Sequence, residues 1–419
     1  MPIGPMNILF LTQVLPFPLD AGPKVRAYYV LRHLAESGHR LTLLSFTRES
    51  DRPEHLEHLR TFCAAIHTVP MRRSKIRDAW TLVRTLASRN PFLIARDWVP
   101  SMAREAAKLA GSLPAFDAVH ADQLWMAPYA LLARNASPGR PLAVLDQHNA
   151  VFNIPRRLAE TGRQPWMRGL LRIEAGKLAR YETDLLGKFD RVVWVTDEDR
   201  QALAHRSDSG TLPGVHTIIP IALDVSARSP LPRGAGIRRV TFMGGLHWPP
   251  NAEGIRWFRR EIWPRIRSRV PGAVLTIIGR DSGRHSAAPP DPAVEIAGYV
   301  ADPAPYLAET AVFIVPLLAG GGMRVKILDA WSLGLPVVST PIGAEGIQAR
   351  DGENLFLADE PDSFASAVVR IMDKPEIAER LSRGGRETVE SRYDSRKVYQ
   401  AWDQIYPCTS CTSFLMRPA

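Results

Sequence analysis

Cysteine is scarce in this sequence, and so are the marks of a secreted or membrane-spanning chain. Three cysteines in 419 residues are too few for a disulfide framework, so we expect a reducing compartment. Cys408 and Cys411 form a C-x-x-C pair, but no second Cys or His pair stands at zinc-site spacing, and we interpret the pair as incidental. No run of 18 apolar residues and no signal-peptide pattern occurs, which predicts a cytoplasmic protein without a membrane-spanning helix.

Acidic residues are outnumbered by basic ones, and 53 Lys and Arg against 43 Asp and Glu give a formal net charge of +10. This excess indicates a negatively charged partner: a nucleic acid, a phosphorylated substrate or an anionic membrane surface. The sequence has no nucleic-acid recognition motif, so we expect no nucleic-acid partner. A G-x-G-x-x-G motif after the first strand of either half is also missing, which argues against a nicotinamide-dependent enzyme.

Short apolar runs alternate with amphipathic helical patterns along the chain. The runs lie at 7–12, 40–46, 116–121, 142–148 and 191–196, and again at 240–245, 274–279, 294–299, 311–318 and 336–340. Nearly continuous apolar runs are typical of parallel strands buried on both faces. Residues 223–239, rich in Pro, Gly and Arg, separate the two sets. The sequence therefore predicts two doubly wound α/β domains in tandem, with ligands bound in the cleft between them, outside the carboxyl ends of the strands.

One basic segment lies outside this rhythm. Residues 72–89 hold six basic residues and one acid, with apolar side chains at helical spacing: Ile76, Trp80, Val83 and Leu86. One interpretation is a helix that lies on an anionic membrane surface. The other is a helix whose apolar stripe packs on its own domain and whose basic face is solvated.

A glycine-rich segment carries the clearest chemical signal. Three consecutive glycines at residues 320–322 precede a helical pattern at about 323–333. Glycine backbone and a helix start together suit a phosphate, because both present N–H groups and the helix adds the positive end of its dipole. Lys326 is placed to meet a phosphate oxygen, and Asp329 to accept hydrogen bonds from a ribose. The alternative is an ordinary surface ion pair between these two residues.

This segment resembles the donor-binding signature of glycosyltransferase family 4, the retaining GT-B glycosyltransferases. The resemblance rests on GGGMRVKILDAWSLGLPVVSTPIGAEGI (320–347), IPIALD (219–224) and VTFMGGLHWPPN (240–251), and it extends over residues 6–405. It implies the GT-B fold: residues 1–222 as the acceptor-side domain and 223–394 as the nucleotide-sugar-binding domain. A final helix at 395–406 would return to the first domain, followed by a tail at 407–419.

The resemblance also implies an activity. The protein would transfer a sugar from a UDP- or GDP-type nucleotide sugar to a glycan or lipid-linked saccharide of cell-surface polysaccharide synthesis, with retention of anomeric configuration. No metal and no other cofactor would be needed. A peripheral position on the cytoplasmic face of the membrane would suit a lipid-linked acceptor.

The resemblance assigns most of the donor site to the second half. Asp329 takes the second position of the family's E-x7-E pair and would bind the ribose, whereas the first position falls on Gly321 and lacks its carboxylate. The usual Arg and Lys are missing from residues 244–254, so we expect Arg324 and Lys326 to bind the diphosphate and act in catalysis. Further donor contacts are expected from Gly245, Tyr299, Gly320, Gly321 and Gly322.

In the first half, Gly22 lies in the loop after the first strand, where close approach of the donor would need glycine. Lys24 and Arg26 either hold an anionic acceptor or are exposed charges. His148, at the carboxyl end of a strand, matches the family position of a histidine that faces the donor sugar, and it is the candidate catalytic histidine. His120 is expected at the same edge as an acceptor contact. For both histidines a structural role is the alternative.

Two other functions fit the same architecture. The missing carboxylate at Gly321 is compatible with a catalytically silent GT-B scaffold that binds a nucleotide sugar. A GT-B phosphorylase or epimerase is the other alternative, because a fold alone does not fix an activity.

Overall fold

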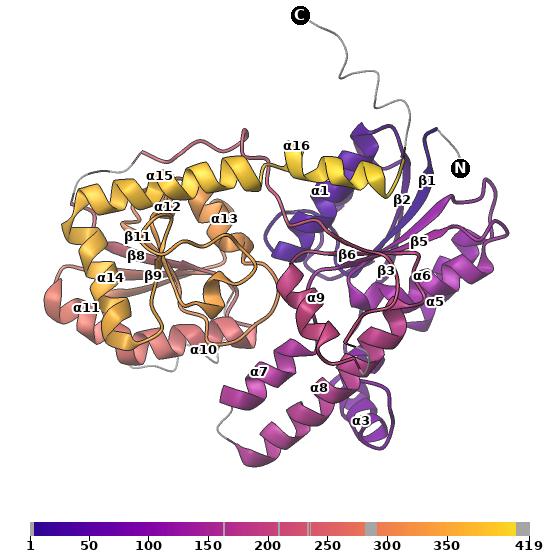
Figure 1. The fold of residues 1–419 in the computed structure, drawn as a ribbon, viewed down its shortest axis with the longest axis horizontal. Coiled ribbons are helices and arrows are strands. Elements are labelled where there is room, and N and C mark those ends of the chain that lie inside the picture. The colour runs from indigo at the N-terminus through magenta and orange to yellow at the C-terminus, as the bar shows by residue number, and fades with distance from the viewer. Residues whose placement is uncertain are drawn as a thin grey trace, which may run out of the picture. The chain divides into compact units, whose positions relative to one another are not determined.

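The computed structural model describes residues 4–161, 164–207, 210–232, 234, 236–280 and 291–407. The chain divides into two compact units (Figure 1). One unit comprises residues 1–222 together with the chain from Arg396 onward, and the other comprises Leu223–Ser395.

The first unit is built on a seven-stranded parallel sheet, in the order β3-β2-β1-β4-β5-β6-β7 among the described residues. Its strands are β1 (Asn7–Thr12), β2 (Arg40–Thr47), β3 (Ala65–Pro70), β4 (Ala118–Asp122), β5 (Leu142–Gln147), β6 (Arg191–Trp194) and β7 (His216–Ile218). The strand order reverses between β1 and β4. In sheets of this kind the loops that follow two such strands diverge and leave a crevice at their carboxyl ends.

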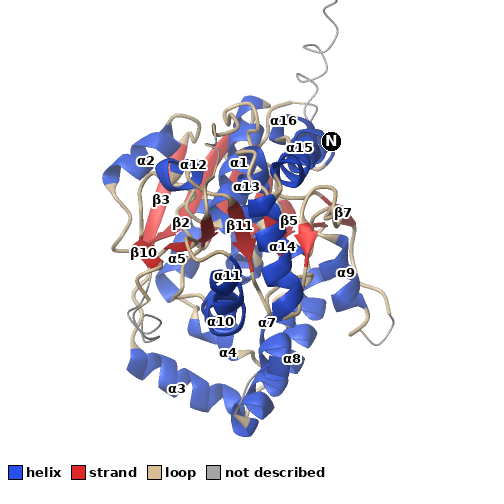
Figure 2. Ribbon diagram, turned by 90° about the vertical axis from the view of Figure 1, so that its left-hand side faces the viewer, coloured by secondary structure: helices blue, strands red, loops and turns tan. Residues whose placement is uncertain are grey.

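Helices lie around this sheet (Figure 2), and their apolar side chains pack against those of the strands. They are α1 (Gly22–Glu36), α2 (Pro53–Arg60), α3 (Lys75–Leu86), α4 (Phe92–Arg96), α5 (Pro100–Ala110), α6 (Ala127–Ala136), α7 (Asn153–Thr161), α8 (Pro165–Leu186) and α9 (Asp197–Ala204). The core joins Leu9, Phe46 and Trp194 of the strands to Met102 of α5 and Leu178 of α8. Within the described part of the chain, no helix combines the length and the apolar character that a membrane crossing requires.

The second unit repeats the pattern with a six-stranded parallel sheet, in the order β10-β9-β8-β11-β12-β13. Its strands are β8 (Arg239–Met243), β9 (Val274–Ile278), β10 (Val294–Gly298), β11 (Val312–Val315), β12 (Val337–Ser339) and β13 (Phe356–Leu357). Its helices are α10 (Pro249–Trp257), α11 (Trp263–Arg269), α12 (Ala304–Ala308), α13 (Val325–Ser332), α14 (Pro361–Asp373) and α15 (Pro375–Arg392). The reversal here lies between β8 and β11. Two doubly wound parallel sheets confirm the predicted fold class.

The end of the chain differs from the single helix predicted at 395–406. A four-residue helix, α16 (Ser395–Val398), is followed by a 3₁₀ segment, Tyr399–Gln404. Three residues per turn bring Tyr399, Trp402 and Ile405 onto one side, and all three are buried. The hydroxyl of Tyr399 accepts a hydrogen bond from the Ala222 backbone N–H, which ties this segment to the first unit. The C-x-x-C pair lies outside the described residues.

Candidate active site

The strand reversal of the second unit places the glycine-rich segments beside each other. Gly244 and Gly245 follow β8 directly, and the loop at residues 316–324 follows β11, the strand hydrogen-bonded to β8. Helix α13 then starts at Val325, so its N-terminal end stands at the carboxyl edge of the sheet. A crevice at this edge is where doubly wound sheets bind nucleotides.

Lys326 lies directly against the backbone that follows β8. Its Nζ donates to Asn251 Oδ1 at 3.0 Å and lies 4.5 Å from the centre of the Phe242 ring. A Cβ atom at Gly244 would stand 2.7 Å from this Nζ, so a side chain at this position would displace the ammonium group. Burial and the nearby Arg324 lower the pKa of Lys326 to about 7. Among the described residues, the ammonium group is hydrogen-bonded to a neutral amide and not to a carboxylate. Its positive charge is therefore available to an anionic ligand.

Arg324 is held by backbone carbonyls of two segments. Its side chain is buried, and its Nη1 donates to the carbonyl oxygens of Gly321 and Gly322, while its Nη2 donates to that of Ile342. The guanidinium therefore ties the glycine loop to the segment after β12. Arg324 therefore positions the loop, and its binding of the diphosphate stays a prediction.

Asp329 lies one turn after Lys326 and forms an ion pair with Arg228. Burial raises the pKa of Asp329, and the Arg228 guanidinium opposes this rise. The side chains of the pair are 19% and 26% exposed, so the carboxylate stays within reach of a ligand. Lys326 and Asp329 thus have separate partners in place of the mutual pair considered above. Sequence reasoning missed Arg228, which lies in the segment interpreted as a linker.

The other predicted donor residues fall into two groups. Gly245 and Gly320 line the same region: a Cβ at Gly245 would stand 2.4 Å from the His247 ring, and one at Gly320 would stand 2.8 Å from Arg324 Nη2. Tyr299 follows β10, two strands from β8, and its ring is half exposed under the Arg280 guanidinium at 4.7 Å. The expected donor contact of Tyr299 stays a prediction.

In the first unit, His148 lies just past the carboxyl end of β5. Its Nε2 lies 2.9 Å from Asp122 Oδ1 and 3.7 Å from Asp146 Oδ2. Burial alone would lower the pKa of His148, but the two carboxylates outweigh burial and raise it to about 9. The imidazole is therefore protonated at neutral pH, where it can donate a hydrogen bond or stabilise negative charge but cannot act as a general base.

Arg26 was predicted to hold an acceptor or to be exposed, and both predictions are wrong. The guanidinium is fully buried and donates to both oxygens of Asp146, at 2.9 and 3.1 Å, and to the carbonyl of Pro220 at 2.8 Å. It also lies 5.1 Å from the centre of the Trp402 ring. The returning segment at residues 399–406 covers it, which sequence reasoning did not foresee.

His120 is buried by the same segment. Its ring stacks on Phe10 at 3.9 Å, and its Nδ1 lies 2.8 Å from the Tyr406 hydroxyl. Burial lowers the pKa of His120 to about 3, so the ring is neutral. The predicted acceptor contact is wrong, because no part of this side chain reaches the surface.

Lys24 and Gly22 keep their places near the end of β1. Lys24 is partly exposed and pairs with Asp20 at 2.9 Å. Gly22 is the first residue of α1 rather than a loop residue, and the cap position before it, Ala21, supplies no side-chain hydrogen bond. Both assignments stay predictions.

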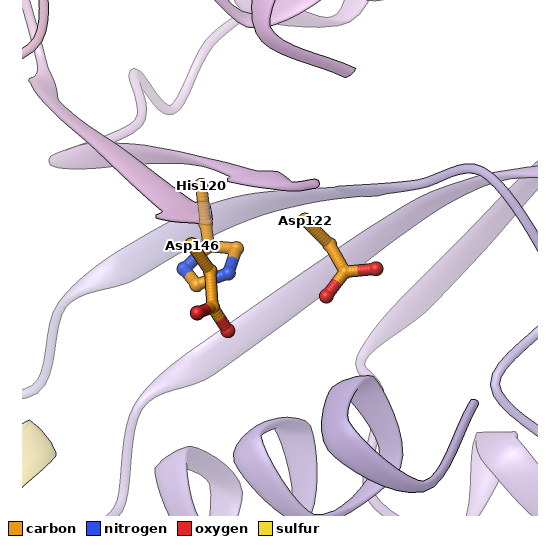
Figure 3. A group of neighbouring side chains, drawn as sticks. All are labelled: His120, Asp122 and Asp146. Atoms are coloured by element: carbon orange, nitrogen blue, oxygen red, sulfur yellow. The ribbon is translucent and has the colours of Figure 1, made fainter. Parts of the chain in front are cut away.

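Carboxylates that suggest a metal have other uses in the first unit. His120, Asp122 and Asp146 offer ligand atoms within 4.8 Å of one another (Figure 3). However, Arg26 and His148 already neutralise these carboxylates, so the group does not fit a resident metal ion. The Asp-x-Asp sequence at residues 197–199 begins α9, where Asp199 accepts hydrogen bonds from Thr196 and Ala150.

Known proteins resemble this chain in sequence and in fold. Residues 237–374 match the family described as glycosyl transferases group 1. The lipopolysaccharide core biosynthesis glycosyltransferase LpsE of Rhizobium meliloti is 31% identical over 148 residues, 33% of this chain and 43% of that protein. An uncharacterized 44.6 kDa protein in the cps region of Klebsiella pneumoniae is 27% identical over 172 residues, 39% of this chain and 44% of that protein. The chain therefore spans less than half the length of either relative.

Among solved structures, HepE of Anabaena in complex with UDP and glucose superposes with a TM-score of 0.67. The two share 14% sequence identity, and the match covers 96% of this chain and 99% of HepE. This likeness spans both units, and the family match falls on the unit that holds Lys326 and Asp329. The chain thus has the two-domain GT-B fold, and residues 237–374 of its second unit match the glycosyl transferases group 1 family.

Proposed function

We propose that this protein is a glycosyltransferase that uses a UDP- or GDP-type nucleotide sugar in the synthesis of a cell-surface polysaccharide or lipopolysaccharide, with retention of anomeric configuration. The observation that carries the proposal is the Lys326 ammonium, held against Gly244 at the carboxyl edge of the second sheet. The name of LpsE and the UDP bound to HepE support the acceptor class and the donor class.

In this proposal the donor diphosphate binds beside Lys326. As the bond between the anomeric carbon and the phosphate oxygen breaks, negative charge grows on the leaving diphosphate, and a preorganised ammonium stabilises it. The second carboxylate oxygen of Asp329 accepts from the ribose hydroxyls while Arg228 holds the first. Arg324 keeps the glycine loop in shape. The residues described at this site need no resident metal or other cofactor to hold the diphosphate.

The acceptor hydroxyl bonds to the anomeric carbon on the face that the diphosphate leaves, and its proton passes to the leaving phosphate. No protein base is required on this route, which agrees with a protonated His148. We assign His148 the role of a cationic donor in the first unit and propose a glycan or lipid-linked saccharide as the acceptor. A lipid-linked acceptor places the protein at the cytoplasmic membrane face.

Thermal-shift titration with a panel of UDP- and GDP-sugars tests the donor site. We expect one nucleotide class to raise the melting temperature of the wild type and to have little effect on Lys326→Ala or Asp329→Ala. Lys108→Ala, an exposed lysine on α5, is the control and should respond as the wild type does. Full responses in both site variants would refute the assignment.

A scaffold that binds nucleotide sugars without transfer is the second candidate, because Gly321 leaves the donor sugar without its usual carboxylate. Transfer assays with the nucleotide sugar that binds best separate the two functions. A bound donor with no product from any glycan or lipid-linked acceptor, in the presence of membranes, would favour the scaffold.

A further inference from the structure

Helix α3 presents its apolar side chains to solvent. Ile76 is 84% exposed, Trp80 62%, Val83 68% and Leu86 51%. At 100° per residue, the first three fall within an arc of about 60°, and Leu86 lies beside them. We call these four residues the α3 stripe. An apolar stripe of this size on an exposed helix needs a partner that removes it from water.

The opposite side of α3 is the one that packs on its own unit. Thr85 is buried there, and Asp78, Thr81 and Leu82, on the same side, are only partly exposed. Lys177 of α8 donates to the carbonyl of Thr85 and so fixes the end of the helix. The helix therefore packs through a largely polar side. This overturns the interpretation in which the stripe packs on its own domain.

Basic residues flank the α3 stripe on both sides. Arg77 and Arg84 lie along one edge, and Lys75 lies along the other. Arg84 stands over the Trp80 ring at 5.4 Å, so its guanidinium is held against the stripe, whereas Arg77 donates to the Arg96 carbonyl of α4. The one acid of the helix, Asp78, is on the packed side. An apolar stripe with two arginines along one edge and a lysine at the other is complementary to an anionic lipid surface.

Helix α8 extends this surface. Trp166 is 66% exposed and Ile173 54%, and their spacing of seven residues puts them on one side of the helix. Lys177, one turn after Ile173, bonds to the carbonyls of Thr85 and Leu86, so α8 meets the end of the α3 stripe. Figures 1 and 2 both draw α3 and α8 next to each other. Tryptophan is enriched where a protein meets the lipid headgroups.

We propose that the α3 stripe, continued by Trp166 and Ile173 of α8, lies in the headgroup region of an anionic bilayer and anchors the first unit to it. This surface would hold the protein at the membrane position proposed above, independently of the donor site. A bilayer satisfies both parts of the pattern at once, because the acyl boundary takes the stripe and the phosphates take Lys75, Arg77 and Arg84.

Vesicle binding of the full chain tests this. Co-sedimentation with vesicles of 70% phosphatidylcholine and 30% phosphatidylglycerol should retain the wild type, with weaker retention by phosphatidylcholine alone and in high salt. We expect Ile76→Glu/Val83→Glu to lower the partition coefficient by about 100-fold or more, since each lost side chain accounts for about tenfold or more. Both positions are exposed, so the variant should unfold at the wild-type temperature.

A matched control is Leu113→Glu, which places the same charge at an apolar residue that is 83% exposed and lies on neither helix. It should bind vesicles as the wild type does, and so should Lys326→Ala, which keeps this test separate from the donor site. Failure of the wild type to bind, equal binding by the stripe variant, or equal loss in Leu113→Glu would each overturn the proposal. So would a stripe variant that turns a dimer into a monomer without changing vesicle binding.

The depth of insertion gives a second measurement. Brominated lipids quench only tryptophans that enter the bilayer, so wild-type fluorescence should fall with brominated vesicles, and less so for Trp80→Phe/Trp166→Phe. Quenching that is unchanged in this variant would show that another surface binds the lipid.

Discussion

The two units place a cation near the strand reversal of the same kind of sheet, but they treat it in opposite ways. In the first unit, Arg26 is fully buried against Asp146, with Trp402 of the returning segment over it. In the second unit, Lys326 has an amide as its described hydrogen-bond partner and a pKa lowered to about 7. A cation that is paired with a carboxylate of the same chain has a structural role. A cation whose charge is not balanced by a carboxylate is available to an anionic ligand. Position in the fold does not by itself distinguish the two.

The largest expected effect is a loss of stability when Arg26, the structural cation, is replaced. Arg26→Met leaves the buried Asp146 carboxylate without its main partner, which should lower the free energy of unfolding by about 3–5 kcal/mol. Chemical denaturation measures this. The double variant Arg26→Met/Asp146→Asn removes the unpaired charge and should recover part of the loss. A double variant as unstable as the single one would mean that packing, and not the ion pair, explains the effect.

The corresponding change in the second unit should act on binding. Lys326→Ala removes an ammonium from the proposed diphosphate site, and one charge-assisted hydrogen bond corresponds to about 10- to 100-fold in affinity. Calorimetric titration with UDP and GDP measures the loss. Unfolding should stay near wild type, because the charge that is removed is poorly compensated in the free protein. If Lys326→Ala lost much stability and kept its nucleotide affinity, Lys326 would have a structural role and not a ligand-binding one.

Nucleotide affinity and stability should each depend on pH, and His148 and Lys326 should affect stability with opposite signs. Nucleotide affinity should fall as pH rises above about 7, because Lys326 is then neutral in the free protein. Stability of the first unit should also carry a signature of His148, whose pKa of about 9 exceeds the ordinary value of 6.5. That contribution is complete below pH 6.5 and is lost as pH rises through 9. The pKa of Lys326 lies below its ordinary value of 10.5, so its contribution to stability has the opposite sign. The free energy of unfolding should rise with pH between about 7 and 10.5 because of this residue.

Titrations in Lys326→Ala and His148→Gln separate the two signals. The first variant should bind nucleotide with little dependence on pH between 6 and 9. The second should lose the stability change between pH 6.5 and 9. Parallel pH profiles in wild type and variants would contradict both assignments.

The smallest effect concerns Arg228. Arg228→Ala removes the guanidinium that opposes the raised pKa of Asp329, so the carboxylate should protonate at a higher pH. We expect nucleotide affinity to fall by a few fold, and most at acidic pH, since a protonated carboxyl accepts hydrogen bonds from a ribose less well. Comparing UDP with 2′-deoxy-UDP isolates the ribose contribution. A variant that discriminates the two as the wild type does would argue against the contact.

The sequence was sufficient for the fold. Strand and helix patterns are local, and so is the spacing that puts Lys326 and Asp329 one turn apart in α13; their use as a donor site stays a prediction. The misassigned residues depend on distant partners. Arg26 is satisfied by Asp146, 120 positions away, and His120 by Tyr406, 286 positions away. The partners of Arg324 were also not foreseen, because a sequence does not indicate that the carbonyls of Gly321, Gly322 and Ile342 point toward one guanidinium.

The α3 stripe was visible as a pattern, but its direction was not. Helical spacing shows that Ile76, Trp80 and Val83 share one side, and it is silent on whether that side faces the protein or the solvent. The choice depends on what α4 and α8 offer to the helix, which only the folded chain reveals.

The returning segment at residues 399–406 has a consequence for how the protein can be divided. The second unit is one continuous stretch of chain, so we expect a fragment of residues 223–395 to retain its architecture. The first unit is discontinuous, and a fragment that stops at residue 222 would expose Arg26 and His120 to water together with the surfaces that bury Trp402 and Tyr406. Separate expression of that half therefore calls for residues 396–407 to be joined to it through a short linker.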